Sequence, residues 1–195
     1  MNRKLLCLLT LFAMPVLAQE PAVAPGTSST RNIKWAVPVT LEGVPNLHRI
    51  TDALYRSEQP TELGFRNLEK MGIRTVINLR FFNDDEDEAR GTGLKLHRIK
   101  ILTWRAGDDH VVKVMQLLRQ KEHGPFLIHC QHGADRTGLM SAMYRMLEEN
   151  WTAQEALEEL VGGGYGFHSM WKNIRRYVLE ADVARLRVAV DSIAD

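Results

Sequence analysis

The chain has 195 residues, 45% of them hydrophobic and 25% charged, which is typical of a globular protein. This length allows one domain with a sizeable core. The formal net charge of +1 argues against a protein that binds nucleic acid through bulk positive charge, so no nucleic-acid partner is expected.

The first 18 residues have the three-part pattern of a secretory signal peptide. Arg3 and Lys4 precede an apolar run from Leu5 to Val16, and small residues follow up to Ala18. We therefore expect export, to the periplasm or out of the cell, with no membrane span in the mature chain. Cleavage after Ala18 would remove Cys7 and leave Cys130 as a lone thiol, either reactive or buried and inert. A lone cysteine excludes an internal disulfide and a multi-cysteine metal site.

Residues 19–33 are rich in Pro, Ala, Ser and Thr, and they predict a flexible linker. The folded domain is then expected over residues 34–195. The first clear helix is predicted from Thr61 to Met71, because its apolar residues are spaced for one face and Gly72 stands where a helix would stop.

A strand rich in β-branched residues is predicted from Thr75 to Arg80. The acidic run Asp84–Glu88 follows, predicted as a solvated loop or first helical turn, with a cation site as the alternative. Residues 94–102 alternate as a second strand would. The next helix has Asp108 or Asp109 as a potential cap and an apolar face made of Val111, Val114, Met115 and Leu118.

The apolar run Phe126–Ile128 predicts a central buried strand that leads into His129 and Cys130. A helix is expected to begin near residues 136–138. A capping box at residues 152–155 opens another helix, and residues 169–190 predict a final one. Alternating strands and helices indicate an α/β fold with a largely parallel sheet, in which ligands bind at the carboxyl ends of the strands. Cys130 stands at such an end.

The stretch HCQHGADRTG, residues 129–138, combines a nucleophile with a potential anion-binding loop. Backbone N–H groups at a helix N-terminus bind anions, and such a position beside a cation lowers the pKa of a thiol from about 8.5. Cys130 and Arg136, in a Cys-x5-Arg arrangement, therefore suit attack on a phosphate monoester without a metal or other cofactor. A buried cysteine beside an unrelated arginine is the alternative, but the full order of strand, His, Cys, Gly, Arg, Thr and Gly favours the functional interpretation.

Each loop position has an expected role. Arg136 can hold two phosphate oxygens with its planar guanidinium, and Thr137 can donate a hydrogen bond to the sulfur as it departs. His129 is expected to order the loop rather than act as a base, and Asp135 to order it through a salt bridge or cap. The residues expected to surround the phosphate are Gln131, His132, Gly133, Ala134, Asp135 and Arg136.

HCQHGADRTG resembles the phosphate-binding signature of the cysteine-dependent protein tyrosine phosphatase superfamily. LYRSEQP (residues 54–60), LEKMGIRTVINLR (68–80) and FLIHCQHGADRTGLMSAMYR (126–145) follow the order and spacing of its compact dual-specificity branch. The resemblance covers most of residues 50–180 and implies a mixed, mostly parallel sheet of four to five strands flanked by helices. It also implies a phosphocysteine intermediate on Cys130, hydrolysed by water, and a supporting role for Arg56 and Ser57.

The resemblance further implies an aspartic general acid on the loop TWRAGDDH, residues 103–110. The large tyrosine phosphatases have Trp-Pro-Asp there, whereas this chain has Trp104 without a proline, and its aspartates lie further on. Asp108 is the first candidate and Asp109 the second, with a plain helix cap as the alternative for Asp108. The acid must hold a proton, which requires burial or a neighbouring phosphate to raise its pKa.

The variable loop positions favour a phosphotyrosine or dual-specificity phosphatase that acts on a phosphorylated protein or a small phosphomonoester. Phosphatases of inositol phosphates usually carry several Lys or Arg there, whereas this loop offers only a histidine, His132. A phosphoinositide or inositol polyphosphate phosphatase with the same chemistry and a non-catalytic phosphate-binding module are the alternatives. The glycine-rich segment GGGYGFH, residues 162–168, is expected to be a plain connection between helices, with a pocket wall as the alternative.

Overall fold

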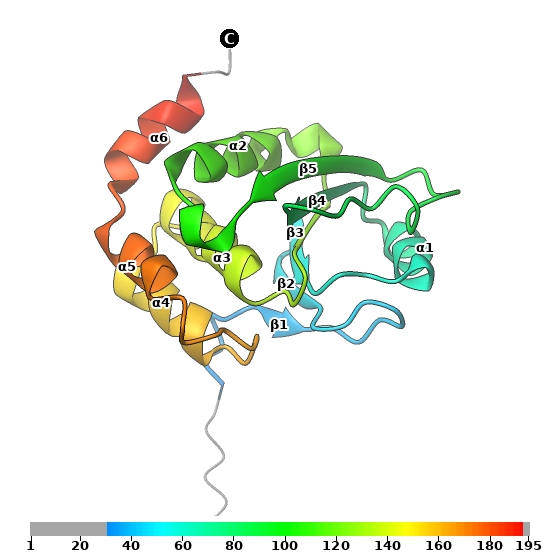
Figure 1. Ribbon diagram of the computed structural model, residues 1–195, viewed down its shortest axis with the longest axis horizontal. Helices are drawn as coiled ribbons and strands as arrows, with labels where there is room; N and C mark the ends of the chain where they lie inside the picture. The colour runs from blue at the N-terminus through cyan, green and yellow to red at the C-terminus, as the bar shows by residue number, and fades with distance from the viewer. Residues whose placement is uncertain (1–30, 193–195) are drawn as a thin grey trace, which may run out of the picture. The chain divides into compact units, whose positions relative to one another are not determined.

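The computed structural model describes residues 31–192; the predicted signal peptide (1–18) and most of the predicted linker (19–33) lie outside them. Within the described residues, no helix is long and apolar enough to cross a membrane. The strands are β1 (Val37–Pro38), β2 (His48–Thr51), β3 (Leu54–Ser57), β4 (Thr75–Arg80), β5 (Lys95–Ile101) and β6 (Phe126–His129). The helices are α1 (Glu62–Met71), α2 (Asp108–Arg119), α3 (Asp135–Glu148), α4 (Ala153–Gly162), α5 (Lys172–Glu180) and α6 (Val183–Asp191), with short 3₁₀ turns η1 (Thr103–Arg105) and η2 (Lys121–His123) (Figure 1).

The six strands form one mixed sheet in the order β1-β2-β3-β6-β4-β5. Strands β3, β6, β4 and β5 run parallel, while β1, β2 and β3 pair antiparallel. The predicted α/β sheet flanked by helices is confirmed, with six strands instead of four to five. The undercount comes from the antiparallel end, where β1 has two residues and β2 and β3 have four each, too short to show a clear period.

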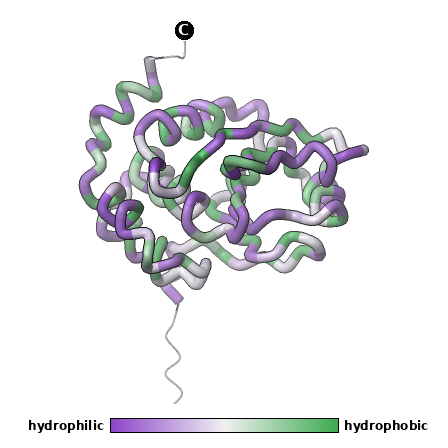
Figure 2. The backbone as a smooth tube through the Cα atoms, in the orientation of Figure 1, coloured by the Kyte–Doolittle hydropathy of each residue, from purple (hydrophilic) through white to green (hydrophobic). Residues whose placement is uncertain are grey.

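The two central strands, β4 and β6, are hydrophobic on both sides because both sheet faces are covered by helices. Ile77 and Ile128 point into a core formed with α2 to α6, whereas Val76 and Leu127 point into a second core with α1. Figure 1 shows α1 apart from the other helices. In Figure 2 the helices alternate between hydrophobic and hydrophilic stretches, as expected when each packs one face inward.

Local signals set several element ends as predicted. Thr61 caps α1 by accepting a hydrogen bond from the N–H of Gly64 at 3.2 Å, and Gly72 ends this helix in the left-handed conformation, with φ 98°. The capping box of Thr152 and Glu155 opens α4.

The prediction of a single helix over residues 169–190 is wrong, because the chain forms α5 and α6 with a break between them. Ala181 is extended, and the Asp182 side chain accepts a hydrogen bond from the N–H of Arg185 at 3.0 Å, which starts a new helix. The apolar spacing continues across this break and therefore conceals it.

Candidate active site

Cys130 lies directly after β6, a strand placed between β3 and β4 in the sheet. Its side chain is 1% exposed. The chain then turns through four residues and enters the 14-residue helix α3 at Asp135. The cysteine therefore stands at the carboxyl end of a central parallel strand and at the N-terminus of a helix, where backbone N–H groups attract anions.

The tight path of the loop depends on Gly133. Its φ of 65° is left-handed, and a Cβ at this position would lie 2.5 Å from backbone atoms of Ser57 and Glu58. Arg56 holds the same turn from β3, since its Nη2 donates to the carbonyl oxygen of Gly133 at 2.6 Å. A side chain at residue 133 would thus push the loop off the end of β3.

Arg136 and Thr137 present donors that have few partners inside the protein. Arg136 is half-buried; its Nη1 makes one long contact of 3.5 Å with the carbonyl oxygen of Ile101. Its Nε and the Thr137 hydroxyl are buried without a hydrogen-bond partner among the described residues. The hydrogen bond expected from Thr137 to the sulfur is not formed in this conformation. An anion bound in the loop is the kind of acceptor that such donors normally find.

A buried cation lies beneath the loop. Arg56 is 1% exposed, and its guanidinium stacks 3.7 Å from the centroid of the Tyr165 ring. Burial lowers the pKa of Arg56 to about 10, while the negative charge of Glu159 opposes this fall. Arg56 therefore stays positive at neutral pH and favours a negative charge above it.

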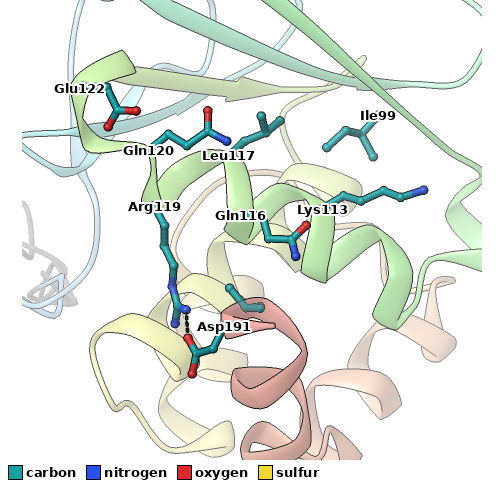
Figure 3. A pocket seen from close by; sticks show the side chains of 9 residues that line it. Ile99, Lys113, Gln116, Leu117, Arg119, Gln120, Glu122 and Asp191 are labelled. Atoms are coloured by element: carbon teal, nitrogen blue, oxygen red, sulfur yellow. Dashed lines mark hydrogen bonds and ion pairs between the residues drawn. The ribbon is translucent and has the colours of Figure 1, made fainter. Parts of the chain in front are cut away.

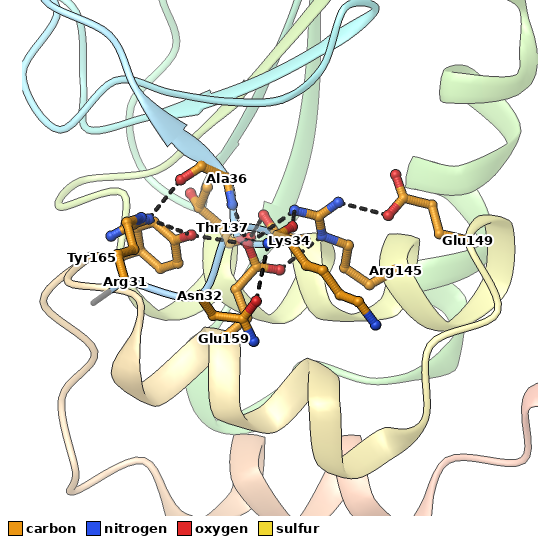
Figure 4. A network of polar contacts seen from close by, with 10 residues as sticks. Arg31, Asn32, Lys34, Ala36, Thr137, Arg145, Glu149, Glu159 and Tyr165 are labelled. Atoms are coloured by element: carbon orange, nitrogen blue, oxygen red, sulfur yellow. Dashed lines mark hydrogen bonds and ion pairs between the residues drawn. The ribbon is translucent and has the colours of Figure 1, made fainter. Parts of the chain in front are cut away.

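Tyr165 belongs to a network of hydrogen bonds and ion pairs that links the ring under Arg56 to α3 and α4 (Figure 4). Its hydroxyl donates to Glu159 at 3.0 Å, and Glu159 is held by Arg145 through bonds of 2.8 and 3.0 Å. Arg31 also belongs to this network, because its Nη2 donates to the Tyr165 hydroxyl at 3.1 Å. These bonds fix the ring on which Arg56 stacks.

The glycine-rich segment of residues 162–168 is hydrogen-bonded to the loop of residues 129–138, which we call the phosphate loop. Asp135 accepts the backbone N–H of His168 at 3.0 Å and pairs with its Nδ1 at 2.9 Å. Asn46 joins the two segments by donating to the carbonyl oxygens of His132 and Tyr165, each at 3.0 Å. This segment is thus more than a plain connection between helices, and Asp135 makes an ordering contact of the expected kind.

His129 contacts a residue that the sequence did not single out. Its Nε2 lies 2.8 Å from Oδ2 of Asp85, and the two side chains are 0% and 2% exposed. Asp85 comes from the acidic run, and the solvated loop predicted there is wrong for this residue, which is buried. Burial raises the pKa of Asp85, but hydrogen bonds from His129, Gln59 and Asn78 outweigh this and lower it.

The two candidate acids lie at the start of α2, but neither caps it, because the N-cap is Gly107. Asp108 accepts a hydrogen bond from the Tyr177 hydroxyl at 2.6 Å and forms an ion pair with Arg185. The Tyr177 bond and the Arg185 charge lower the pKa of Asp108, against a smaller effect of burial. Asp109 is exposed. In this conformation the contacts of Asp108 favour the ionised form, whereas a general acid needs a proton.

A hollow of about 700 Å³ lies elsewhere, between β5, α2 and α6 (Figure 3). The described residues that line it include Ile99, Lys113 and Gln116, together with Arg119 and Asp191, which form an ion pair. None of them belongs to the loop of residues 129–138. The size of a cavity thus does not locate the reactive site here, whereas the chemistry of the loop does.

Asp108→Asn should lower the melting temperature at pH 7 by about 2–4 °C, because it removes the charged acceptor of Tyr177 and Arg185. The corresponding loss in the free energy of unfolding is about 1 kcal/mol. The contacts lower the pKa of Asp108 in the folded state. Their stabilisation is therefore present above the usual aspartate pKa of about 3.9 and is lost as the pH falls through the folded value. Thermal unfolding at pH 7 and near pH ~3 should show the difference shrinking in acid.

Asp109→Asn is the matched control for stability, because this neighbouring carboxylate is exposed, and the variant should keep the melting temperature of the wild type.

The variants Asp108→Asn and Asp109→Asn also test which residue is the general acid. Loss of a general acid slows hydrolysis of an alkyl phosphate far more than of an aryl phosphate, whose leaving group needs little protonation. The variant with that asymmetry identifies the acid, and if neither shows it, both assignments fail.

Comparison with known proteins identifies the family to which the chain belongs. The tyrosine phosphatase family model matches residues 44–162. The chain is 36% identical over 172 residues to the dual specificity protein phosphatase TpbA of Pseudomonas aeruginosa, covering 87% of this chain and 77% of the relative. A crystal structure of a cysteine-to-serine variant of TpbA with phosphotyrosine superposes with a TM-score of 0.75 at 33% identity, over 84% of this chain and 99% of that one. Inositol diphosphatase DSP5 of Arabidopsis thaliana is 27% identical over 163 residues, 76% of each chain. The chain therefore belongs to the tyrosine phosphatase family, and its predicted resemblance to the dual-specificity branch is confirmed.

Proposed function

We propose that the chain is a phosphatase of the phosphotyrosine or dual-specificity type that works without a metal ion, through a phosphocysteine on Cys130. The observation that carries the proposal is one loop. It places a buried cysteine at the N-terminus of α3, with the donors of Arg136 in the same turn. Family membership and the similarity to TpbA support the same activity.

The reaction has two displacements at phosphorus. The thiolate of Cys130 donates an electron pair to phosphorus, the bond to the ester oxygen breaks, and this oxygen takes a proton from the general acid. Arg136 and the backbone N–H groups of residues 131–136 hold the three non-bridging oxygens. In the second step water attacks phosphorus and passes a proton to the carboxylate that the general acid became in the first step, the P–S bond breaks, and the thiolate is restored.

A phosphorylated protein, with phosphotyrosine as the favoured residue, is the proposed substrate. The TpbA variant crystallised with phosphotyrosine is similar to this chain over most of its length. The loop itself holds no lysine, and Arg136 is its single arginine. An inositol phosphate is the second candidate, which the similarity to the inositol diphosphatase favours. A substrate with many phosphates would require additional cations at the mouth.

We also propose that the protein is exported. This rests on the sequence, in which Arg3 and Lys4, the apolar run and the small residues before Gln19 form the pattern of a cleaved signal peptide. A periplasmic or extracellular enzyme would meet phosphorylated groups on exported proteins or in the medium.

A hydrolysis panel with EDTA tests the function. We expect release of phosphate from p-nitrophenyl phosphate and from a phosphotyrosine peptide, with less from phosphothreonine peptides, phosphoinositides and inositol hexakisphosphate. Released phosphate is measured at each substrate concentration, and Cys130→Ser is the control. The best turnover on an inositol phosphate would replace the peptide assignment, while binding of phosphate without any turnover would identify a non-catalytic phosphate-binding module.

A further inference from the structure

Asn46, on the loop before β2, has a backbone conformation that is unusual for a residue with a side chain. Its φ is 54°, and it is one of two non-glycine residues with a positive φ in the described part of the chain. Asparagine tolerates the left-handed region better than most residues, but the conformation still needs support from its surroundings. The proposed mechanism gives this residue no task, although its contacts lead to the phosphate loop.

The side-chain amide of Asn46 uses both of its hydrogens on backbone carbonyl groups. Its Nδ2 donates to the carbonyl oxygens of His132 and Tyr165, each at 3.0 Å. Two carbonyl acceptors determine which end of the amide faces them, because Oδ1 has no hydrogen to donate. The carbonyl oxygen of Asn46 lies 3.0 Å from Nδ1 of His48, which holds the backbone that carries the amide.

The bond to His132 sets the direction of the next N–H group of the phosphate loop. In a planar trans peptide the C=O and N–H groups point to opposite sides. Because Asn46 binds the carbonyl of His132, the N–H of Gly133 points away from Asn46. Arg56 binds the carbonyl of Gly133 at 2.6 Å, so the N–H of Ala134 points away from Arg56. Neither N–H has a hydrogen-bond partner among the described residues, which leaves both as donors for an anion.

The peptide between His132 and Gly133 is the one in this turn that reverses most easily. Turning a peptide over changes ψ of the residue before it and φ of the residue after it. Gly133 has a φ of 65°, and glycine adopts a negative φ equally well, so its backbone offers little resistance. The reversed peptide would present a carbonyl oxygen instead of an N–H to the anion. Among the described residues, the hydrogen bond that opposes this reversal comes from Asn46.

We propose that Asn46 is a positioning residue of the phosphate loop, which holds the peptide between His132 and Gly133 so that the Gly133 N–H donates to an oxygen of the bound phosphate. The kinetic part of this inference rests on the proposed function. The orientation of the peptide can be followed without turnover, through the binding of tungstate, a tetrahedral dianion similar in shape to phosphate.

The test is Asn46→Gly in the full chain, because glycine adopts the left-handed φ without strain and lacks the amide. Calorimetric titration measures the Kd for tungstate. We expect it to rise by about tenfold, as the loss of one hydrogen bond to a charged group implies. The value of kcat/KM for p-nitrophenyl phosphate should fall by a similar factor. Asn46→Asp, which puts carboxylate oxygens against the two carbonyl groups, should weaken tungstate binding at least as much.

The amide signals of the loop in nuclear magnetic resonance separate this role from a general loosening. In the isotope-labelled wild type, the signals of Gly133 and Ala134 should both move when tungstate is added. In Asn46→Gly the movement of the Gly133 signal should shrink, whereas that of Ala134 should persist, because Arg56 still holds the peptide before it. Equal loss of both movements would mean that Asn46 supports the loop as a whole, and would overturn the proposal.

Asn150→Gly is the matched control. Asn150 is the other described non-glycine residue with a positive φ, 59°, and its side chain accepts a hydrogen bond from Arg187 at 2.6 Å, between α3 and α4. This variant should keep the Kd and kcat/KM of the wild type.

Two results would overturn the proposal. One is an unchanged tungstate affinity in Asn46→Gly, and the other is a Gly133 signal of the wild type that does not respond to tungstate. The second is decisive even if Asn46→Gly does not fold. Selective loss of the Gly133 response in a chain that hydrolyses no phosphate ester would refute the proposed function and leave the role of Asn46 standing.

Discussion

Cys130→Ser should reduce turnover by at least about four orders of magnitude, or ~5.5 kcal/mol of transition-state free energy, and leave phosphotyrosine binding intact. A serine hydroxyl is not ionised at neutral pH, and Nε2 of His129 is engaged by Oδ2 of Asp85 rather than by residue 130. In the proposed mechanism the donors that hold the phosphate belong to Arg136 and to the loop backbone, and the substitution preserves both. Single-turnover kinetics on p-nitrophenyl phosphate and calorimetric titration with phosphotyrosine measure the two properties separately.

The control for this experiment is Cys7→Ser, which lies in the predicted signal peptide and should retain full activity. A phosphocysteine adduct, trapped by rapid acid quench of the wild-type protein and absent from Cys130→Ser, would place the covalent bond on this residue. Turnover that persists in Cys130→Ser would contradict the mechanism and require a different nucleophile.

The features that the sequence predicts well are those set by residues close together in the chain. Thr61 and Gly72 bound α1 through contacts within one turn, and Thr152 with Glu155 opens α4 in the same way. The phosphate loop is also local, since its strand, its glycine and its arginine lie within about a dozen residues. Gly133 illustrates this, because the left-handed φ expected of a tight turn is present.

The features that escape prediction depend on partners distant in the chain. In the sequence Asp85 cannot be distinguished from its acidic neighbours, because its partner His129 lies 44 positions away in the chain. Tyr165 likewise becomes a support of the loop only because Arg56 arrives from β3 and stacks on its ring. No periodicity or composition distinguishes such residues, since the information lies in which strands become neighbours.

Asp108 shows how residues distant in the chain set the environment of a candidate acid. The sequence predicts it on a loop before a helix, whereas in the structure it is the first residue of α2, where Tyr177 and Arg185 from the C-terminal helices contact it. Their hydrogen bonds favour the charged carboxylate. The prediction of an acid depends on an environment that α5 and α6 supply, and the sequence predicts these two helices as one.

Arg136→Lys should lower kcat by about 100- to 1,000-fold, or 2.7–4 kcal/mol, with a smaller change in KM. Lysine keeps the positive charge and the helix, so the folded structure and much of the attraction for phosphate remain. It loses the planar fork that can donate two parallel hydrogen bonds to phosphate oxygens. Steady-state kinetics on p-nitrophenyl phosphate measures the effect, and thermal unfolding should show an unchanged melting temperature.

Comparing the effects of Arg136→Lys on kcat and on KM separates the role of the guanidinium's planar shape from the role of its charge. Charge alone attracts the ground-state phosphate and the transition state almost equally, whereas a fork aimed at the oxygens as they spread around phosphorus stabilises the transition state more. Arg136→Ala removes charge and fork together and should therefore raise KM in addition to lowering kcat. Arg175→Lys, at an exposed position on α5, is the matched control and should behave as the wild type. Near-normal kcat in Arg136→Lys would mean that this residue orders the loop without touching the phosphate, and the donors would then have to come from the backbone and from Arg56.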